Sequence, residues 1–202
     1  MMSQDLNHRG ASPRGPANAV DHELILDAAR DLMSTIGIRR TTMADVARAA
    51  QVSRATLYRR YPNVQALAAA VTTREFVAAL SSMGLFDGAT GRETITRTVV
   101  HVTATARAHP LLRRIVELDP EFLMPYLLHR TGRTSRAQLE AITRSIAAGQ
   151  ADGSIRGGEP AEHAAVVLQL AWSSALTGPV FTESADLLDA QLFDLIDRYL
   201  AP

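Results

Sequence analysis

The chain is 202 residues long, 47% of its residues are hydrophobic, and it contains no cysteine. The apolar content is sufficient for a globular core, and the lack of cysteine excludes disulfides and thiolate-ligated metal sites. The formal net charge is zero, yet residues 38–62 carry six arginines and a single acid. This local excess of positive charge is typical of a nucleic-acid-binding surface. Because the chain has no lysine, arginine must make every basic contact.

The N-terminal residues 1–19 are rich in Ser, Asn, Gly and Pro and lack apolar periodicity, so a disordered arm is predicted. Arg9 and Arg14 would let this arm reach a DNA minor groove, and the sequence leaves open whether it does. No apolar run is long enough for a membrane span or placed as a signal peptide. A cytoplasmic protein without membrane association is therefore expected.

A first helix is predicted from Asp21, as its N-cap, to about Ile36, with Gly37 at its C-terminal end. Two short helices should follow within residues 41–61. Thr42 and Asp45 form a capping box for the first of them, and Ser53 caps the second.

The second short helix, predicted over Arg54–Tyr61, carries arginines and hydroxyl groups around a single apolar residue, Leu57. It is too polar for a core helix and has the side chains that a helix needs in a DNA major groove. Together with the flanking helices it predicts a helix-turn-helix domain over residues 20–66. A fourth helix should begin at or near Pro62 and continue to about Ser82.

The remaining residues, 67–202, predict further helices, and the whole chain reads as all-α with about nine helices; the resemblance described below implies that 67–202 form a ligand-binding and dimerisation domain. Asp119-Pro120 is predicted to open a helix that Pro125 must kink or split. Residues 160–177 are apolar almost all round, which indicates contact with something outside the monomer. A last amphipathic helix is predicted over Ser184–Leu200.

The ordered set of motifs across residues 24–71 resembles the N-terminal domain of TetR-family transcriptional regulators. The set comprises Ile25 to Ala29, Thr41-Thr42, Asp45-Val46-Ala47, Val52-Ser53, Thr56-Leu57-Tyr58, Tyr61-Pro62 and Leu67. The resemblance implies a homodimer that places one recognition helix per subunit in successive major grooves of a palindromic DNA operator. The residues expected at the DNA are Arg40, Thr41, Thr42, Ser53, Arg54, Ala55, Thr56, Tyr58, Arg59 and Tyr61.

Three positions depart from the pattern of the family that the sequence resembles. Gln51 stands where a Gly usually precedes the Val-Ser pair, and backbone strain is expected there. Ala55 replaces another common Gly. Val64 and Gln65 stand where a phosphate-binding Lys is often found, so Arg39 or Arg40 would have to replace that contact.

The resemblance also implies that the last two long helices pair two subunits as a four-helix bundle. The interface residues expected on these helices are Val167, Leu168, Ala171, Ala175, Leu188, Leu192, Leu195 and Ile196. A small apolar effector is expected among the preceding helices, in a pocket lined by Met83, Phe86, Val102, Ala106, Phe122, Met124, Tyr126, Trp172 and Phe181. Residues of these types belong to a protein core more often than to a pocket wall.

The function predicted is a sequence-specific transcriptional repressor released by a small apolar ligand. An activator, or a DNA-binding regulator without a ligand, fits the sequence equally. An enzyme or carrier with a vestigial helix-turn-helix is the alternative from another class, but no nucleophile elbow, phosphate loop or usable acid pair supports it. No cofactor or metal is predicted, because His101, His109, His129 and His163 lack the spacing of helical metal ligands.

Overall fold

The structure is a computed structural model that describes residues 17–81, 89–128 and 132–202. These residues form eleven α-helices and one 3-10 turn and contain no strand, which confirms the all-α prediction. The number exceeds the expected nine. The short helix α10 (Gly178–Phe181) was not anticipated, whereas α7 (Met124–Leu128) falls in the segment that Pro125 was predicted to kink or split.

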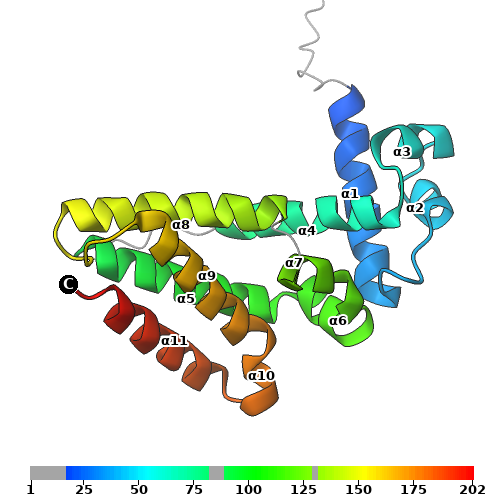
Figure 1. The fold of residues 1–202 in the computed structure, drawn as a ribbon. Coiled ribbons are helices and arrows are strands. Elements are labelled where there is room, and N and C mark those ends of the chain that lie inside the picture. The colour runs from blue at the N-terminus through cyan, green and yellow to red at the C-terminus, as the bar shows by residue number, and fades with distance from the viewer. Residues whose placement is uncertain (1–16, 82–88, 129–131) are drawn as a thin grey trace, which may run out of the picture.

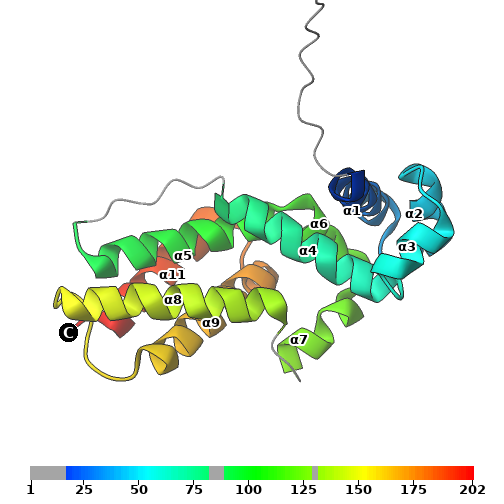
Figure 2. The same ribbon diagram turned by 90° about the horizontal axis from the view of Figure 1, so that it is seen from above.

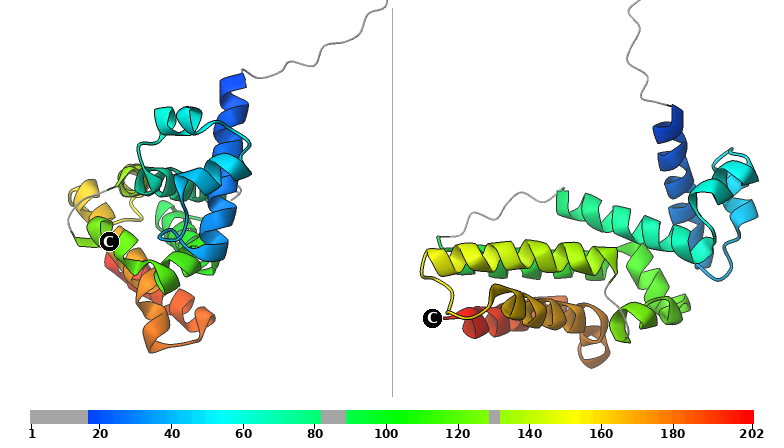
Figure 3. Two further views of the ribbon diagram at one scale, coloured as in Figure 1. Left: turned by 90° about the vertical axis from the view of Figure 1, so that its right-hand side faces the viewer. Right: turned by 45° about the horizontal axis from the view of Figure 1, so that its top comes forward.

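Helices α1 (Ala17–Ile36), α2 (Met43–Ala49) and α3 (Arg54–Arg60) gather at one end of the molecule (Figure 1). Helix α4 (Val64–Ser81) leaves this end and reaches toward the C-terminal helices (Figure 3). The prediction that α1 starts at Asp21 was wrong, because its first turn begins at Ala17, inside the segment expected to be disordered. Residues 1–16 of that segment lie outside the described residues.

The start of α4 also differs from the prediction. Pro62 lies two residues before the helix, and the cap is Asn63, whose side-chain Oδ1 accepts a hydrogen bond from the N–H of Ala66 at 2.8 Å. An Asn side chain satisfies one of the free N–H groups of the first turn, which Pro cannot do.

The C-terminal part consists of α5 (Gly91–Ala108), α6 (Pro110–Leu118), the 3-10 turn η1 (Pro120–Phe122), α7, α8 (Arg133–Ala151), α9 (Pro160–Leu176), α10 and α11 (Ala185–Leu200). Helices α5, α8, α9 and α11 run side by side, and α6, η1 and α7 lie between them and the N-terminal helices (Figure 2). The predicted split is observed: η1 ends at Phe122, α7 begins at Met124, and Pro125 lies in the first turn of α7.

Two hydrophobic cores hold these elements together. One contains buried side chains of α5, α8, α9 and α11, including Ile146, Val167 and Ile196. The other joins α1–α4 but also takes in Leu111 and Ile115 of α6 and Leu123 after η1. Helix α6 is therefore packed into the core of the N-terminal helices, although the sequence groups it with the C-terminal residues.

Candidate nucleic-acid interface and effector cavity

Helix α3 is held in place by one apolar side chain and one cap. Leu57 is fully buried against α1 and α2, and burying a leucine contributes about 1.5–3 kcal/mol. The N-cap Ser53 accepts a hydrogen bond at its Oγ from the N–H of Thr56 at 3.0 Å. The side chains of Arg54, Tyr58 and Arg59 are exposed on the remaining faces. A helix anchored through one residue can present the rest of its surface to a DNA groove.

The predicted capping box at the start of α2 is confirmed. The Thr42 hydroxyl accepts a hydrogen bond from the N–H of Asp45 at 3.1 Å and donates one to its carboxylate at 2.6 Å. That hydroxyl, with the guanidinium of Arg48 at 3.0 Å, lowers the pKa of Asp45. Arg48 is thus paired within its own helix, while Arg40 is exposed on the preceding loop.

The turn between α2 and α3 contains the strained residue that the sequence suggested. Gln51 has a φ of +54°, the only positive φ at a non-glycine among the described residues. A side chain in this left-handed region crowds its own backbone, which is why Gly is favoured there. The expectation of strain at Gln51 is confirmed.

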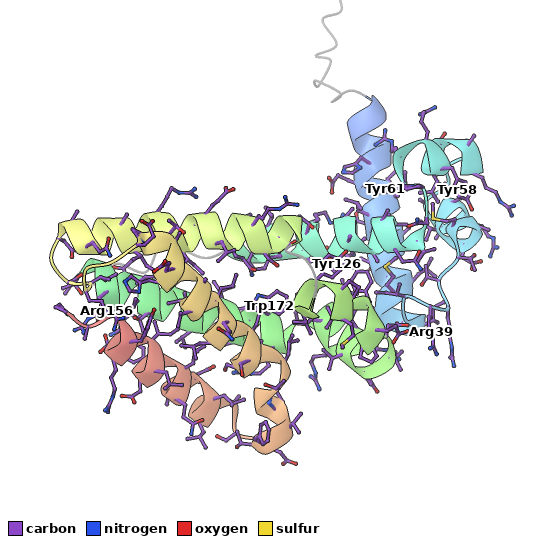
Figure 4. All side chains as sticks on the ribbon, in the orientation of Figure 1. Arg39, Tyr58, Tyr61, Tyr126, Arg156 and Trp172 are labelled. Carbon is purple, nitrogen blue, oxygen red and sulfur yellow. The ribbon has the colours of Figure 1, made fainter. Side chains whose placement is uncertain are left out.

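Two residues expected at the DNA face the core instead. Thr41 is 3% exposed, and its hydroxyl donates to the carbonyl of Gly37 at 2.7 Å. Tyr61 is 8% exposed and lies against α1, where its hydroxyl is 3.2 Å from Nδ1 of His22 (Figure 4). By contrast, Tyr58 is 53% exposed on the outer side of α3. Both side chains are therefore directed into the core of α1–α4 and away from the surface on which DNA contacts were expected.

The other predicted contact residues lie on the outer surface of α2, α3 and the loops before them. Thr56 is half-buried, and the remaining seven are exposed: Arg40, Thr42, Ser53, Arg54, Ala55, Tyr58 and Arg59. Arg39, considered as a substitute phosphate ligand, instead lies 3.5 Å from the carboxylate of Glu121 and 4.0 Å from that of Asp119. Arg40 is thus the better placed of the two for DNA.

A cavity of about 480 Å³ lies between α4, α5, α6, α8 and α9. Its volume falls within the range of small-molecule sites, and its wall is predominantly apolar. Five residues expected in a pocket line it: Val102, Ala106, Phe122, Tyr126 and Trp172. Figure 4 labels Tyr126 of α7 and Trp172 of α9, which lie near the middle of the molecule.

Two other pocket expectations were wrong, and two cannot be placed. Met124 is exposed on α7, and Phe181 is 86% exposed on α10; neither lines the cavity. Both residues lie on helices of about one turn. Such helices are too short for sequence periodicity to predict which side chains face the surface. Met83 and Phe86 lie outside the described residues.

Asp119 connects the wall of the cavity to the N-terminal helices. It ends α6, is 2% exposed, and its carboxylate accepts hydrogen bonds from the N–H groups of Ile38 at 2.6 Å and Arg39 at 3.1 Å. Asp119 occupies the predicted N-cap position before Pro120, but its side chain makes no capping bond to η1. Nothing in the local sequence signals this contact, since its partners precede it by 81 and 80 residues.

Most residues expected at the dimer interface are buried within one chain. Val167, Leu168 and Ala171 of α9, and Leu188, Leu192 and Ile196 of α11, belong to the monomer's own core. Helices α5 and α8 pack against α9, and α5 packs against α11. The sequence of a helix that is apolar on all sides does not show which of its faces is covered within the monomer. Ala175 is half-buried, whereas Leu195 is exposed.

Among the described residues, no three His, Asp or Glu side chains gather as a metal site. Within the same ranges, no helix is both long and apolar enough to cross a membrane.

Comparison with known proteins identifies the family. A profile of bacterial regulatory proteins of the tetR family matches residues 25–71. The chain is 31% identical over 168 residues to a protein of Mycobacterium bovis described as an HTH-type transcriptional regulator, covering 83% of each chain.

Solved structures show the same fold at low identity. The fatty acid degradation regulator FadR from Bacillus halodurans has a TM-score of 0.63 at 16% identity, covering 92% of this chain and 96% of that one. FadR from Bacillus subtilis, solved with stearoyl-CoA, has a TM-score of 0.64 at 14% identity, covering 89% and 99%. With its helix-turn-helix, its helical C-terminal part and its sequence relatives, the chain belongs to the TetR family of transcriptional regulators.

Proposed function

We propose that this regulator is a homodimeric repressor that holds a palindromic operator through α3 and releases it when an apolar molecule fills the cavity. The observation that carries the proposal is the double role of α6 and η1. Leu111, Ile115 and Leu123 line the cavity and also belong to the core of α1–α4. A ligand that moves these side chains therefore moves part of the packing that positions α3.

The DNA side of the proposal rests on the exposed surface of α3 and its caps. Arg54 is exposed near the start of α3, where a guanidinium can take a guanine bidentately, which is worth roughly 1–3 kcal/mol of discrimination. Tyr58 and Arg59 are suited to the phosphate backbone. The exposed hydroxyls of Thr42 and Ser53 lie at helix N-termini, where backbone N–H groups favour phosphate.

The dimer side of the proposal uses the outer faces of α9–α11. Val180 and Phe181 of α10 are 78% and 86% exposed, and Leu187 and Leu195 of α11 are exposed as well. Neighbouring exposed apolar residues of this size favour a protein interface. We expect Leu195→Arg to shift the protein from dimer to monomer in sedimentation, whereas Val116→Arg, also at an exposed apolar position but on α6, should leave it dimeric.

An apolar effector fits the cavity better than a charged one. Burying an unpaired charge is costly, and the wall offers mainly aliphatic and aromatic side chains. FadR from Bacillus subtilis, which has a similar fold, was solved in complex with stearoyl-CoA, whose acyl chain is apolar. Binding can shift the operator equilibrium only as far as the ligand prefers one conformation over the other.

The test begins with selection of bound DNA from a random pool, followed by anisotropy titrations of the selected site. We expect a palindromic site and a log–log salt slope of roughly −5 to −7, if six to eight phosphates are contacted per dimer. A flat salt dependence contradicts DNA binding by this surface. Metabolite fractions titrated onto the complex should then contain one that releases the DNA; a fraction that tightens the complex would indicate an activator or co-repressor.

A further inference from the structure

The polar side chains of the cavity wall mostly have their hydrogen bonds made already. Five hydroxyls donate to a backbone carbonyl one turn earlier in their own helix: Thr72, Thr73, Thr98, Thr103 and Ser145. A hydroxyl engaged in this way presents chiefly its methyl or methylene group to the cavity. These residues therefore make the wall less polar than its composition suggests.

Two ionisable groups of the wall, Glu75 and His109, are paired, whereas Arg136, which also lines the cavity, is exposed to solvent. The carboxylate of Glu75 accepts a hydrogen bond from Arg74 at 2.8 Å, and its second oxygen lies 3.5 Å from Nε2 of His109. Arg74 is also bridged to Asp27 of α1 at 3.0 Å. A charged ligand near Glu75 would have to compete with these ion pairs, so the buried part of the wall favours a neutral ligand.

Gln138 is the exception among the described residues of the wall. Its Oε1 is buried and has no hydrogen-bond partner, which is true of no other described side chain that lines the cavity. Gln138 lies on α8 one turn after Thr134, whose hydroxyl contacts Thr73 of α4 at 3.0 Å, and one turn before the buried Ile142. Residues four apart share a helix face, so Gln138 lies on the side of α8 that faces α4 and the cavity.

We propose that the effector is a neutral, mainly apolar molecule with one hydroxyl or amide N–H group, which donates a hydrogen bond to Oε1 of Gln138. This inference rests on the proposed role of the cavity as the effector site. A buried carbonyl oxygen without a partner costs free energy, which a donor on the ligand recovers. A site with such an acceptor discriminates against an analogue that lacks the donor.

The test uses two isomeric probes, 1-decanol and 1-methoxynonane, which have the same atoms but differ in the O–H donor. Trp172 is the single tryptophan of the chain and lines the cavity, so its fluorescence reports occupancy of the full-length protein without DNA. We expect 1-decanol to bind roughly tenfold more tightly than the ether. In Gln138→Met, which keeps the length of the side chain, the two affinities should become equal through weaker binding of the alcohol.

The control is Gln65→Met, the same chemical change at an exposed position of α4, which should keep the preference. The proposal would be overturned if the wild type bound both probes equally or bound neither. It would also be overturned if the preference for the alcohol survived in Gln138→Met. If the variant does not fold by circular dichroism, the comparison of the two probes on the wild type still decides. The fluorescence experiment contains no DNA, so it tests ligand binding alone. A failure to bind the operator would appear only in the anisotropy titration.

Discussion

The carboxylate of Asp119 accepts a hydrogen bond from the backbone N–H of Ile38 at 2.6 Å, joining the end of α6 to the loop between α1 and α2. This hydrogen bond is buried, and the second carboxylate oxygen of Asp119 accepts one from the N–H of Arg39 at 3.1 Å. Since α6 also lines the cavity, this pair is a direct polar link between the cavity wall and the helices of the proposed DNA-binding surface.

Asp119→Ala should lower the free energy of unfolding by about 2–4 kcal/mol, because it leaves two N–H groups without acceptors, one of them buried. Urea denaturation followed by circular dichroism measures the change. Glu121→Ala is the matched control, since it removes only an exposed ion pair with Arg39 and should cost less than about 1 kcal/mol. Equal effects of the two variants would refute the structural role of Asp119.

Gly37→Ala should destabilise the protein more than Gly153→Ala. Both glycines have a positive φ, +86° and +77°, which costs an alanine about 1 kcal/mol. A Cβ on Gly37 would also lie 2.7 Å from Oδ2 of Asp119, whereas a Cβ on Gly153 meets nothing within 4 Å. Thermal unfolding should separate the two variants, and the excess loss in Gly37→Ala should shrink in an Asp119→Ala background.

Gln51→Gly should stabilise the protein by about 0.5–1 kcal/mol, because glycine adopts a φ of +54° without steric cost. Ala49→Gly, two residues earlier and inside α2, should destabilise it by a similar amount. Chemical denaturation of both variants gives the comparison. A loss of stability in Gln51→Gly would mean that the glutamine side chain offsets its own strain.

Tyr58→Phe should change DNA affinity but not stability, whereas Tyr61→Phe should change stability but not the salt dependence of DNA binding. Tyr58 is exposed, so losing its hydroxyl should leave unfolding unchanged and weaken binding to all DNA sequences. Tyr61 is buried beside His22, so losing its hydroxyl should cost about 1 kcal/mol of stability and leave the salt slope of DNA binding unchanged. Denaturation and anisotropy on the same two proteins measure both quantities.

Thr42→Ala should raise the pKa of Asp45 toward its ordinary value of 3.8, because the Thr42 hydroxyl is the main group that lowers it. A carboxyl with a lowered pKa stabilises the folded state above its unfolded pKa, and this contribution disappears as the pH falls through the folded pKa. The stability difference between wild type and Thr42→Ala should therefore shrink in acid. NMR titration of the Asp45 carboxyl carbon gives the pKa, and Thr42→Ser should keep it low.

Several local features of this protein follow from the sequence by itself. The caps at Thr42 and Ser53 form as their spacing predicts, because each cap bond joins residues three positions apart. Helical periodicity likewise predicts the long helices, and the φ of Gln51 follows from a turn that requires the left-handed region. The short helices α7 and α10 lie below the length at which periodicity is informative.

Which face of each helix is covered was decided only by the tertiary structure. Val167 and Ile196 are equally suited to a monomer core and to a dimer interface, and the packing of α5 and α8 assigned them to the core. Tyr61 is buried in the core of α1–α4 beside His22, while Tyr58, three residues earlier, is exposed. The bond from Asp119 to Ile38 joins residues 81 positions apart. Such contacts depend on how distant segments pack, and no local pattern of residue types encodes that.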